Sequence, residues 1–309
     1  MPPFASNEGT FLLPFAENNH KVLGIDPAKN IVEMAVAAGV PTKCAFFGEK
    51  AAEEIVKEHG RAKIVFARNV LAHVANLHDF VKGMRLCVAD DGLMVIEVHY
   101  AKIIYEELHY DSIYHEHLCY FTLKSIERLF NTHGLHIFDI GSSPISGGAL
   151  ILYIKTKRNQ ENPVVNFCRN SEKESKVNEL ASWQDFAERV KNHRNKLLAI
   201  LKDETKHGKI IGYGASARSS TLANYCKIDG RFLSAIADQN PLKHKLYTPG
   251  TRVLIDIPEN VISEKTGCIL LLAWNFADEI MESLKEKFHY SGKCILPLPN
   301  SPRIVNLGE

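Results

Sequence analysis

The sequence predicts an α/β protein of two units, each with a parallel sheet covered by helices. In the first half, short apolar strands alternate with helical segments, beginning with Lys21–Asp26 and Pro27–Ala38. In the second half the alternation starts again at Lys209–Tyr213, a strand that leads directly into a glycine-containing loop. Between the halves, a charged stretch carries apolar residues at the spacing of amphipathic helices. This pattern favours two nucleotide-binding α/β units joined by helices.

Further elements of the first half follow in the same alternation. Lys63–Ala67 and Gly92–Val98 are apolar runs typical of strands buried on both faces of a parallel sheet. Leu77–Val88, between them, has the apolar spacing of a helix. Thr122 is placed to cap the next helix and Gly134 to end it. This helix and a hairpin-like pair of strands are expected over Leu123–His133, Leu135–Ile140 and Ala149–Lys155.

The second half predicts a smaller unit of the same kind. Strands at Leu233–Ala237 and Cys268–Ala273 and a helix at Phe276–Phe288 follow its first strand. We therefore expect an α/β domain over residues 1–157, a helical linker over 158–207 and a C-terminal Rossmann-like domain over 208–309. The charge runs of the linker are interpreted as solvent-exposed faces.

Composition and charge restrict the class of protein. The 309 residues are 45% hydrophobic and 24% charged, which is typical of a globular protein. A formal net charge of +1 gives no bias toward nucleic acid or an anionic membrane, so neither is expected as a partner. No apolar run approaches the ~20 residues of a membrane span, and the N-terminus lacks a signal peptide. The seven cysteines form no C-x-x-C pair, so we expect reduced thiols in a cytoplasmic protein and no metal site.

The cluster Tyr114, His115, Glu116 and His117 is the strongest indication of chemistry. Imidazole is the side chain best matched to proton transfer near neutral pH, and a neighbouring carboxylate can raise its basicity. In an extended segment the two histidines would face one way and the other two residues the opposite way. The two histidines lack the H-E-x-x-H spacing of a zinc protease. A polar surface loop is the alternative interpretation.

A mononucleotide site is indicated near the N-terminus. Ser6, Asn7, Glu8 and Gly9 form a polar turn ahead of a helical segment, and Asp26 closes the next strand. Such a turn can approach a ligand closely, and an acid at a strand end can accept hydrogen bonds from a ribose diol. The alternative for Asp26 is an ordinary strand-to-helix turn.

Three more polar residues lie near strand ends in the first half. Asn69 follows the strand Lys63–Ala67, and Glu97 lies near the end of Gly92–Val98. Ligands of open α/β sheets bind at the carboxyl ends of strands, so both are candidate site residues. His73 lies four residues after Asn69; taken alone, a histidine in such a segment is more often structural than functional.

In the second half, the loop from Gly212 to Ala217 fits the pattern G-x-G-x-x-A, and Asp238 ends the next strand. Taken literally, this is a dinucleotide fingerprint. It supports a nicotinamide-dependent oxidoreductase as an alternative function.

Along the chain stand, in this order, the motifs SNEGTFLLPF, GIDPAKNI, NVLAHV, IEV, YHEHLCYF, GGALILYI, GYGASAR and LLAWNFADEI. From Ser6 to the C-terminus the sequence resembles the S-adenosylmethionine-dependent sugar C-methyltransferases, which act on nucleotide-activated 4-keto-deoxysugars. The resemblance implies a class I methyltransferase Rossmann-like domain followed by a smaller Rossmann-like C-terminal domain. It also implies S-adenosylmethionine as cofactor and a nucleotide-sugar as substrate.

The resemblance implies roles for the residues singled out above. His117 would be the base that removes a proton next to the ketone of the sugar. Tyr114 and Glu116 would line the site, and His73 would approach the substrate. Ser6, Asn7, Glu8, Gly9, Asp26 and Asn69 would bind the cofactor. The substrate would contact Glu97, Tyr120, Gly212, Gly214, Ala215, Ser216, Arg218, Asn224, Trp274 and Asn275.

The sequence departs from the family at its N-terminus. Relatives carry a cysteine-rich zinc module and then a strand that enters the cofactor loop, whereas here Met1–Ala5 precede Ser6. We therefore expect a truncated member in which the first strand of the sheet is missing. Pro2 and Pro3 lack N–H donors and are poor replacements for that strand. A third interpretation follows, a non-catalytic homologue that binds nucleotide-sugars.

Overall fold

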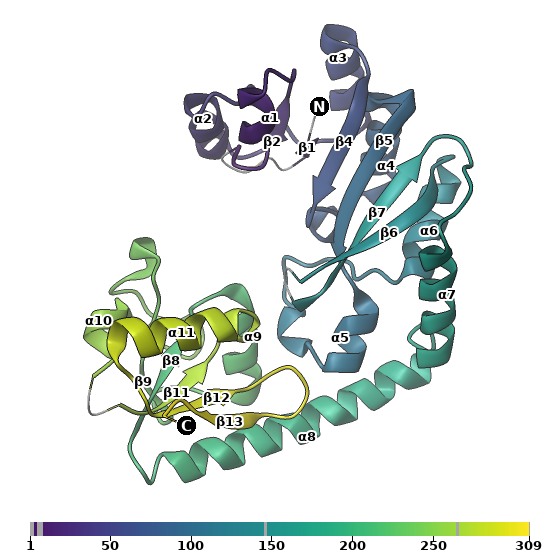
Figure 1. The fold of residues 1–309 in the computed structure, drawn as a ribbon. Coiled ribbons are helices and arrows are strands. Elements are labelled where there is room, and N and C mark those ends of the chain that lie inside the picture. The colour runs from purple at the N-terminus through teal and green to yellow at the C-terminus, as the bar shows by residue number, and fades with distance from the viewer. Residues whose placement is uncertain (1–2, 5–8, 145–146, 264–265, 309) are drawn as a thin grey trace. The chain divides into compact units, whose positions relative to one another are not determined.

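The computed structural model describes residues 3–4, 9–144, 147–263 and 266–308, and the chain forms two compact α/β units (Figure 1). The first unit contains residues 1–102 and 116–178, and the second contains 103–115 and 179–309. The boundary therefore falls inside the Tyr114–His117 cluster, between His115 and Glu116. The range 158–207, which the sequence predicts as a linker, is divided between the two units.

The first unit is built on a seven-stranded sheet in the order β3-β2-β1-β4-β5-β7-β6. Neighbouring strands from β3 to β5 pair in parallel, and β7 pairs antiparallel with β5 and β6. This topology agrees with the class I methyltransferase fold that the sequence predicts. The strands are β1 (Pro3–Phe4), β2 (Gly24–Asp26), β3 (Thr42–Cys44), β4 (Ala62–Arg68), β5 (Val88–His99), β6 (His136–Ser143) and β7 (Ala149–Lys155).

The central strand corrects the expectation that the first strand is missing. β1 is two residues long, yet it lies between β2 and β4. Phe4 is opposite Ile25 on one side and Ala67 on the other, and Pro3 is opposite Phe66. A ladder joins backbone groups and does not require an alternating side-chain pattern, so two residues can form one. The same shortness removes the periodic signal by which a strand is recognised in a sequence.

Helices of the first unit include three that the sequence predicts: α2 (Lys29–Ala37), α4 (Leu77–Cys87) and α6 (Leu123–Thr132). Thr122 caps α6 as expected, because the Ser125 N–H donates to its Oγ1 over 3.2 Å and Ser125 Oγ accepts from its N–H over 3.0 Å. The other described helices here are α1 (Leu13–Glu17), α3 (Glu49–His59), η1 (Leu71–His73) and α7 (Pro163–Ser175).

The carboxylate of Glu172, on α7, is buried at the start of α6. It accepts hydrogen bonds from the Leu123 and Lys124 N–H groups, from the Tyr100 hydroxyl at 2.9 Å and from the Asn178 amide at 3.0 Å. The first N–H groups of a helix have no partner within the helix, and the helix dipole favours an anion there. Glu172 thus joins α7 to α6 through the peptide groups at the start of α6.

The second unit is a six-stranded sheet in the order β10-β9-β8-β11-β12-β13, parallel except for β13. Strands β8 (Lys209–Tyr213) and β9 (Leu233–Ala237) have the predicted bounds, and α11 (Ala277–Phe288) begins one residue after its prediction. The remaining strands are β10 (Ile255–Asp256), β11 (Thr266–Leu271), β12 (Lys293–Leu296) and β13 (Arg303–Asn306). The helices include η2 (Tyr110–Ser112), α8 (Leu180–Glu204), α9 (Ala217–Cys226), η4 (Pro241–Lys243), α10 (Pro258–Val261) and η5 (Trp274–Phe276). Helix α5 (Ala101–Glu107) begins in the first unit and continues in the second from Ile103.

Helix α8 carries a buried histidine on its apolar face. His193 lies in line with Val190 and Leu197, at helical spacing. Its Nε2 lies 2.6 Å from the Pro297 carbonyl, which can only accept, so this nitrogen carries the proton and Nδ1 accepts from the Tyr110 hydroxyl at 3.1 Å. Burial lowers the pKa of His193. The ring is therefore held in its neutral form.

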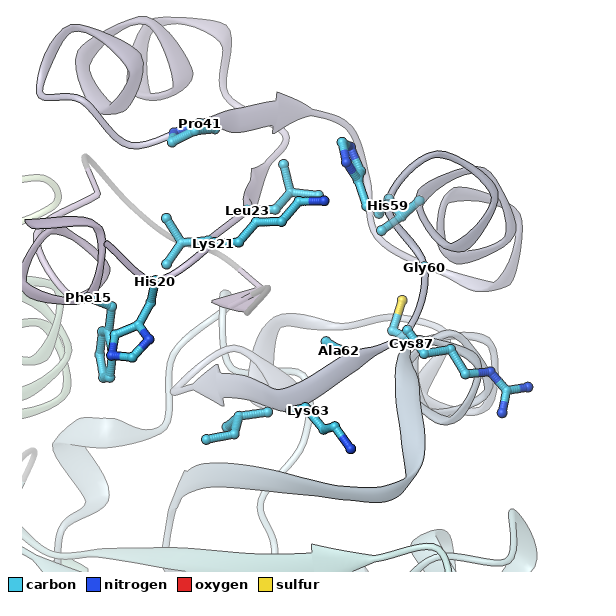
Figure 2. Close-up of a pocket in the computed structure, with 14 residues that line it drawn as sticks. Phe15, His20, Lys21, Leu23, Pro41, His59, Gly60, Ala62, Lys63 and Cys87 are labelled. Atoms are coloured by element: carbon cyan, nitrogen blue, oxygen red, sulfur yellow. The ribbon is translucent and has the colours of Figure 1, made fainter. Parts of the chain in front are cut away.

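A pocket of about 710 Å³ opens at the amino ends of β2 and β4 (Figure 2). Figure 2 shows Leu23 on one side of it and Ala62 on the other, with Cys87 and His59 nearby. The pocket lies where β1 enters the sheet, and its lining contains none of the predicted site residues. The predicted strand-end residues lie at the opposite, carboxyl edge of the sheet.

In the part of the chain that the structure describes, no helix is both long and apolar enough to span a bilayer.

The Glu172 cluster predicts a stability effect. Replacing Glu172 by Gln turns an NH2 group toward donors and removes the charge, so we expect the free energy of unfolding to fall by about 2 kcal/mol. Urea unfolding followed by far-ultraviolet circular dichroism measures this loss. Glu174→Gln, an exposed position on the same helix, is the matched control. An equal, small effect of both substitutions would contradict the assigned role of Glu172.

His193 predicts a pH dependence in the second unit. Because its folded-state pKa is lowered, both states are neutral above about pH 6.5, and below it the unfolded state binds a proton that the folded state does not. Stability should therefore fall as the pH falls, by up to ~1.4 kcal/mol for each pH unit below that value. His193→Gln should show a shallower slope between pH 7 and pH 5.5. Both tryptophans, Trp183 and Trp274, lie in the second unit, so their fluorescence reports its unfolding. Equal slopes for both proteins would refute the assignment.

Candidate active site

Several candidate residues of the first unit lie at the carboxyl edge of its sheet. Asp26 is the last residue of β2, Asn69 follows β4, and Glu97 lies near the end of β5. Gly9 comes after β1 and before α1. Because β1, β2, β4 and β5 are parallel, their carboxyl ends lie on one edge, where ligands of open α/β sheets bind. The prediction that these residues share one edge agrees with the topology.

Asp26 has features of both interpretations that the sequence leaves open. Its Oδ1 accepts the Ala28 N–H at 2.9 Å, which is the turn-forming role. Its side chain makes no further hydrogen bond within the described ranges. The residue is nevertheless buried, with 6% of its surface exposed. The turn-forming role of Asp26 is therefore shown, and its ligand-binding role stays a prediction.

Asn69 and Glu97 are neighbours across the β4–β5 ladder. The Asn69 N–H donates to the Glu97 carbonyl at 2.8 Å, and Arg68 Nε donates to Glu97 Oε2 at 2.7 Å. Asn69 has a φ of 51°, a left-handed conformation that asparagine tolerates. Glu97 Oε1 is buried and finds no hydrogen-bond partner among the described residues. A buried, unpaired carboxylate oxygen at this edge is the strongest structural indication of a ligand site.

Gly9 is described, whereas Ser6, Asn7 and Glu8, also predicted to bind the cofactor, lie outside the described residues. Gly9 has a φ of 85°, and a Cβ at this position would lie 3.0 Å from the Val40 side chain. Its carbonyl accepts the N–H groups of Leu12 and Leu13 as α1 begins. Conformation and close packing both require glycine here.

Two predicted catalytic histidines meet in the first unit. His73 ends the short helix η1 after β4, and its ring centroid lies 5.0 Å from that of His117. The Leu118 N–H donates to the Ala72 carbonyl at 2.7 Å, which fixes the two segments to each other. The Tyr120 ring lies 6.0 Å from His117. The fold thus brings together two residues that are 44 positions apart in the chain, and their imidazole rings meet edge to face.

The Tyr114–His117 cluster is a turn and not an extended segment. Tyr114 is in a bend and His115 and Glu116 form the turn, so the alternating arrangement of an extended chain does not apply. His115 and Glu116 are exposed, whereas Tyr114 and His117 are half-buried. Glu116 and His117 belong to the first unit, and Tyr114 belongs to the second.

In the second unit, the predicted loop after β8 is held by its own structure. Gly214 has a φ of 94°, and a Cβ there would lie 2.5 Å from the Ala273 Cβ. The Ala215 N–H donates to Asp238 Oδ2 at 2.7 Å. Ser216 caps α9 through a reciprocal pair of hydrogen bonds with Ser219. Gly212 is required by packing, since a Cβ would lie 2.9 Å from the side chains of Ile236 and Leu272.

The predicted substrate residues Arg218 and Trp274 share a buried partner, Asp111. The guanidinium donates from Nε to Asp111 Oδ2 at 3.0 Å and from Nη2 to Oδ1 at 2.9 Å. Trp274 Nε1 donates to Oδ2 at 2.7 Å, and the guanidinium carbon lies 4.7 Å from the indole centroid. Sequence reasoning missed Asp111. Its position three residues before Tyr114 was the available signal, but its partner lies 107 residues away in the chain.

The two weaker candidates of this unit lie near the same loops. The Asn224 amide donates to the carbonyls of Ser220 at 2.8 Å and Pro249 at 3.0 Å, so it holds α9 to a turn. Asn275 lies in η5, directly after Trp274, and is half-buried. Their assignment to substrate binding stays a prediction.

Gly9, Asp26 and Asn69, which the sequence assigns to the cofactor, lie at one sheet edge together with the predicted substrate residue Glu97. Their assignment to S-adenosylmethionine and to the substrate stays a prediction. Among the residues described, no group of three or more histidine, cysteine, aspartate or glutamate side chains is arranged to hold a metal ion.

Comparisons with known proteins match both units. A family model for a methyltransferase domain matches residues 4–139, and a model for a C-methyltransferase C-terminal domain matches residues 144–299. The C-methyltransferase NovU of Streptomyces niveus is 32% identical over 306 residues, which cover 98% of this chain and 73% of that protein.

Two solved structures show weaker likeness. A SAM-dependent methyltransferase from Anabaena variabilis is 19% identical with a TM-score of 0.41, over 50% of this chain and 76% of that one. Magnesium protoporphyrin IX methyltransferase from Synechocystis, solved with bound SAM, is 13% identical with a TM-score of 0.35, over 50% and 67% of the two chains. The assignment depends on the family models and the curated relative. The chain is a methyltransferase of the C-methyltransferase family, with a class I methyltransferase domain and a C-methyltransferase C-terminal domain.

Proposed function

We propose that this methyltransferase uses S-adenosylmethionine to methylate a carbon next to the ketone of a nucleotide-linked 4-keto-deoxysugar. The pairing of His73 with His117, whose ring centroids are 5.0 Å apart near the carboxyl edge of the first sheet, carries the proposal. Carbon methylation next to a ketone requires removal of a proton, and imidazole is suited to that step near neutral pH. Two imidazoles also allow one to act as base while the other contacts the substrate oxygen.

In this mechanism His117 takes the proton from the carbon, and the electron pair left behind forms an enolate. His73 stabilises the developing negative charge on the enolate oxygen, as a preorganised donor does. Bound S-adenosylmethionine supplies an electrophilic methyl group. Tyr114, Glu116 and Tyr120 complete the site in this proposal.

The second unit would hold the nucleotide part of the substrate. The loop from Gly212 to Ser216 precedes α9, whose N-terminus offers the partial positive charge that phosphate groups favour. Arg218 and Trp274 lie in the first turn of α9 and in the loop after β11, at the same carboxyl edge of the second sheet. Their positive charge and aromatic surface suit a nucleoside diphosphate.

The oxidoreductase alternative is disfavoured by Asp238. In a dinucleotide site this acid accepts hydrogen bonds from a ribose. Here its carboxylate already accepts the Ala215 and Asn240 N–H groups at 2.7 and 2.8 Å and the Lys243 ammonium at 3.1 Å. A nicotinamide dinucleotide would have to break this cluster. The non-catalytic alternative is disfavoured because β1 is present in the sheet, between β2 and β4.

Asp26→Asn tests the cofactor site. The amide keeps an oxygen for the Ala28 turn but loses the charge, so we expect the affinity for S-adenosylhomocysteine, measured by titration calorimetry, to fall about tenfold or more. Asp229→Asn is the matched control, since Asp229 forms the same kind of turn with the Arg231 N–H in the second unit. Unchanged binding by Asp26→Asn would remove Asp26 from the site.

Histidine substitutions test the base. We expect His117→Gln to lower kcat by about 10²–10⁴-fold on a nucleoside-diphosphate 4-keto-6-deoxyhexose, without weakening S-adenosylhomocysteine binding. Exchange of the substrate α-proton with solvent deuterium isolates the proton-removal step, so the true base is the histidine whose loss abolishes exchange. His78→Gln, at an exposed position of the first unit, is the control. Full exchange in both His117→Gln and His73→Gln would refute a histidine base.

A further inference from the structure

The short helix η2, which leads into the Tyr114–His117 cluster, is buried within the second unit. Tyr110, Asp111 and Ser112 are exposed by 5%, 1% and 0% of their surfaces. They precede a bend and a turn whose residues 115 and 116 are exposed. A charged residue is rarely buried to this degree unless it is paired.

Asp111 joins η2 to the two loops that the proposed function assigns to the nucleotide. Its two carboxylate oxygens accept two hydrogen bonds from Arg218, in the first turn of α9, and one from Trp274, in η5. The guanidinium also stacks over the indole at 4.7 Å. The three side chains thus contact one another in a closed triangle. A bidentate carboxylate–guanidinium pair fixes orientation as well as distance.

Tyr110 attaches the same segment at a second point. Its hydroxyl lies 3.1 Å from His193 Nδ1 on α8 and 3.4 Å from Cys226 Sγ at the end of α9. Burial raises the pKa of the Cys226 thiol, so the sulfur stays protonated. Two consecutive residues of η2 therefore bind three different helical elements of the second unit, α8, α9 and η5.

The chain beyond the cluster is attached elsewhere. Leu118, directly after His117, donates its N–H to Ala72 in the first unit, next to His73. Between Asp111 and Leu118 lie six residues, including all four of the cluster. Asp111 is the charged anchor of the segment that enters this stretch from the second unit.

We propose that Asp111 is a positioning residue, which locks the chain entering Tyr114 to the loops carrying Arg218 and Trp274. The inference rests on the proposed function, because it assigns those loops to the nucleotide of the substrate. Energy of binding remote from the reacting carbon can then be used to place Tyr114, as expected when remote contacts act on kcat. Asp111 touches neither substrate nor cofactor in this role.

Asp111→Asn is the test variant, because it keeps the shape and an acceptor for Trp274 while removing the charge paired with Arg218. Trp274→Phe is the second variant, which deletes a single N–H donor and leaves no unpaired charge. Glu204→Gln is the matched control. Glu204 is another buried carboxylate of the second unit, paired with Lys293 at 2.9 Å, and it lies on the last turn of α8.

Two measurements test the positioning role of Asp111. First, we expect amide hydrogen exchange of residues 113–118 to quicken about tenfold or more in Asp111→Asn, to a smaller degree in Trp274→Phe and not in Glu204→Gln. Second, we expect kcat on the nucleoside-diphosphate keto-sugar to fall about tenfold or more in Asp111→Asn, with affinity for S-adenosylhomocysteine within about twofold of the parent.

Unchanged exchange in Asp111→Asn and Trp274→Phe would overturn the lock. Faster exchange with unchanged kcat would overturn the positioning role, as would an equal loss of kcat in Glu204→Gln. A parent protein that methylates no keto-sugar would refute the proposed function, while the exchange measurement would still decide whether Asp111 locks this segment.

Discussion

Parallel pairing at the centre of the first sheet is the constraint on which the candidate site depends. Because β2, β1, β4 and β5 run in one direction, Gly9, Asp26, Asn69 and Glu97 lie at one edge although the sequence spreads them over 89 positions. The segment after β4 also carries η1, so His73 lies close to the same edge. The direction of the strands therefore brings these candidate residues together, and they come from several loops.

Sequence patterns predicted the elements that repeat their signal over several residues. β8 and β9 are continuous apolar runs, α4 has a helical apolar stripe, and α6 has both a cap and a stop residue. β1 escaped prediction because two residues contain no periodicity. β3 (Thr42–Cys44) is as short as β2 but lacks the buried apolar run by which β2 was found. β13 is an antiparallel edge strand with largely exposed side chains, so it lacks the apolar run of a buried strand.

The candidate site likewise contains residues that sequence patterns could identify and residues that they could not. Residues next to strand ends could be found, because position along a strand decides the edge on which they lie. The contact between His73 and His117 needed the resemblance, since no local pattern relates them. Asp111 was missed despite its position near Tyr114, because its partners are Arg218 and Trp274, and only the folded second unit brings those side chains together.

The two-residue strand β1 separates the candidate residues of the first sheet into two groups. One side, with β2 and β3, carries Asp26; the other, with β4, β5, β6 and β7, carries Asn69, Glu97 and both histidines. The ladder between these sides passes through Pro3 and Phe4. A ligand that contacts Asp26 and Glu97 together would act as an additional cross-link between the sides, and by mass action it would stabilise the assembled sheet. Ligand binding and completion of the fold would then be one coupled equilibrium.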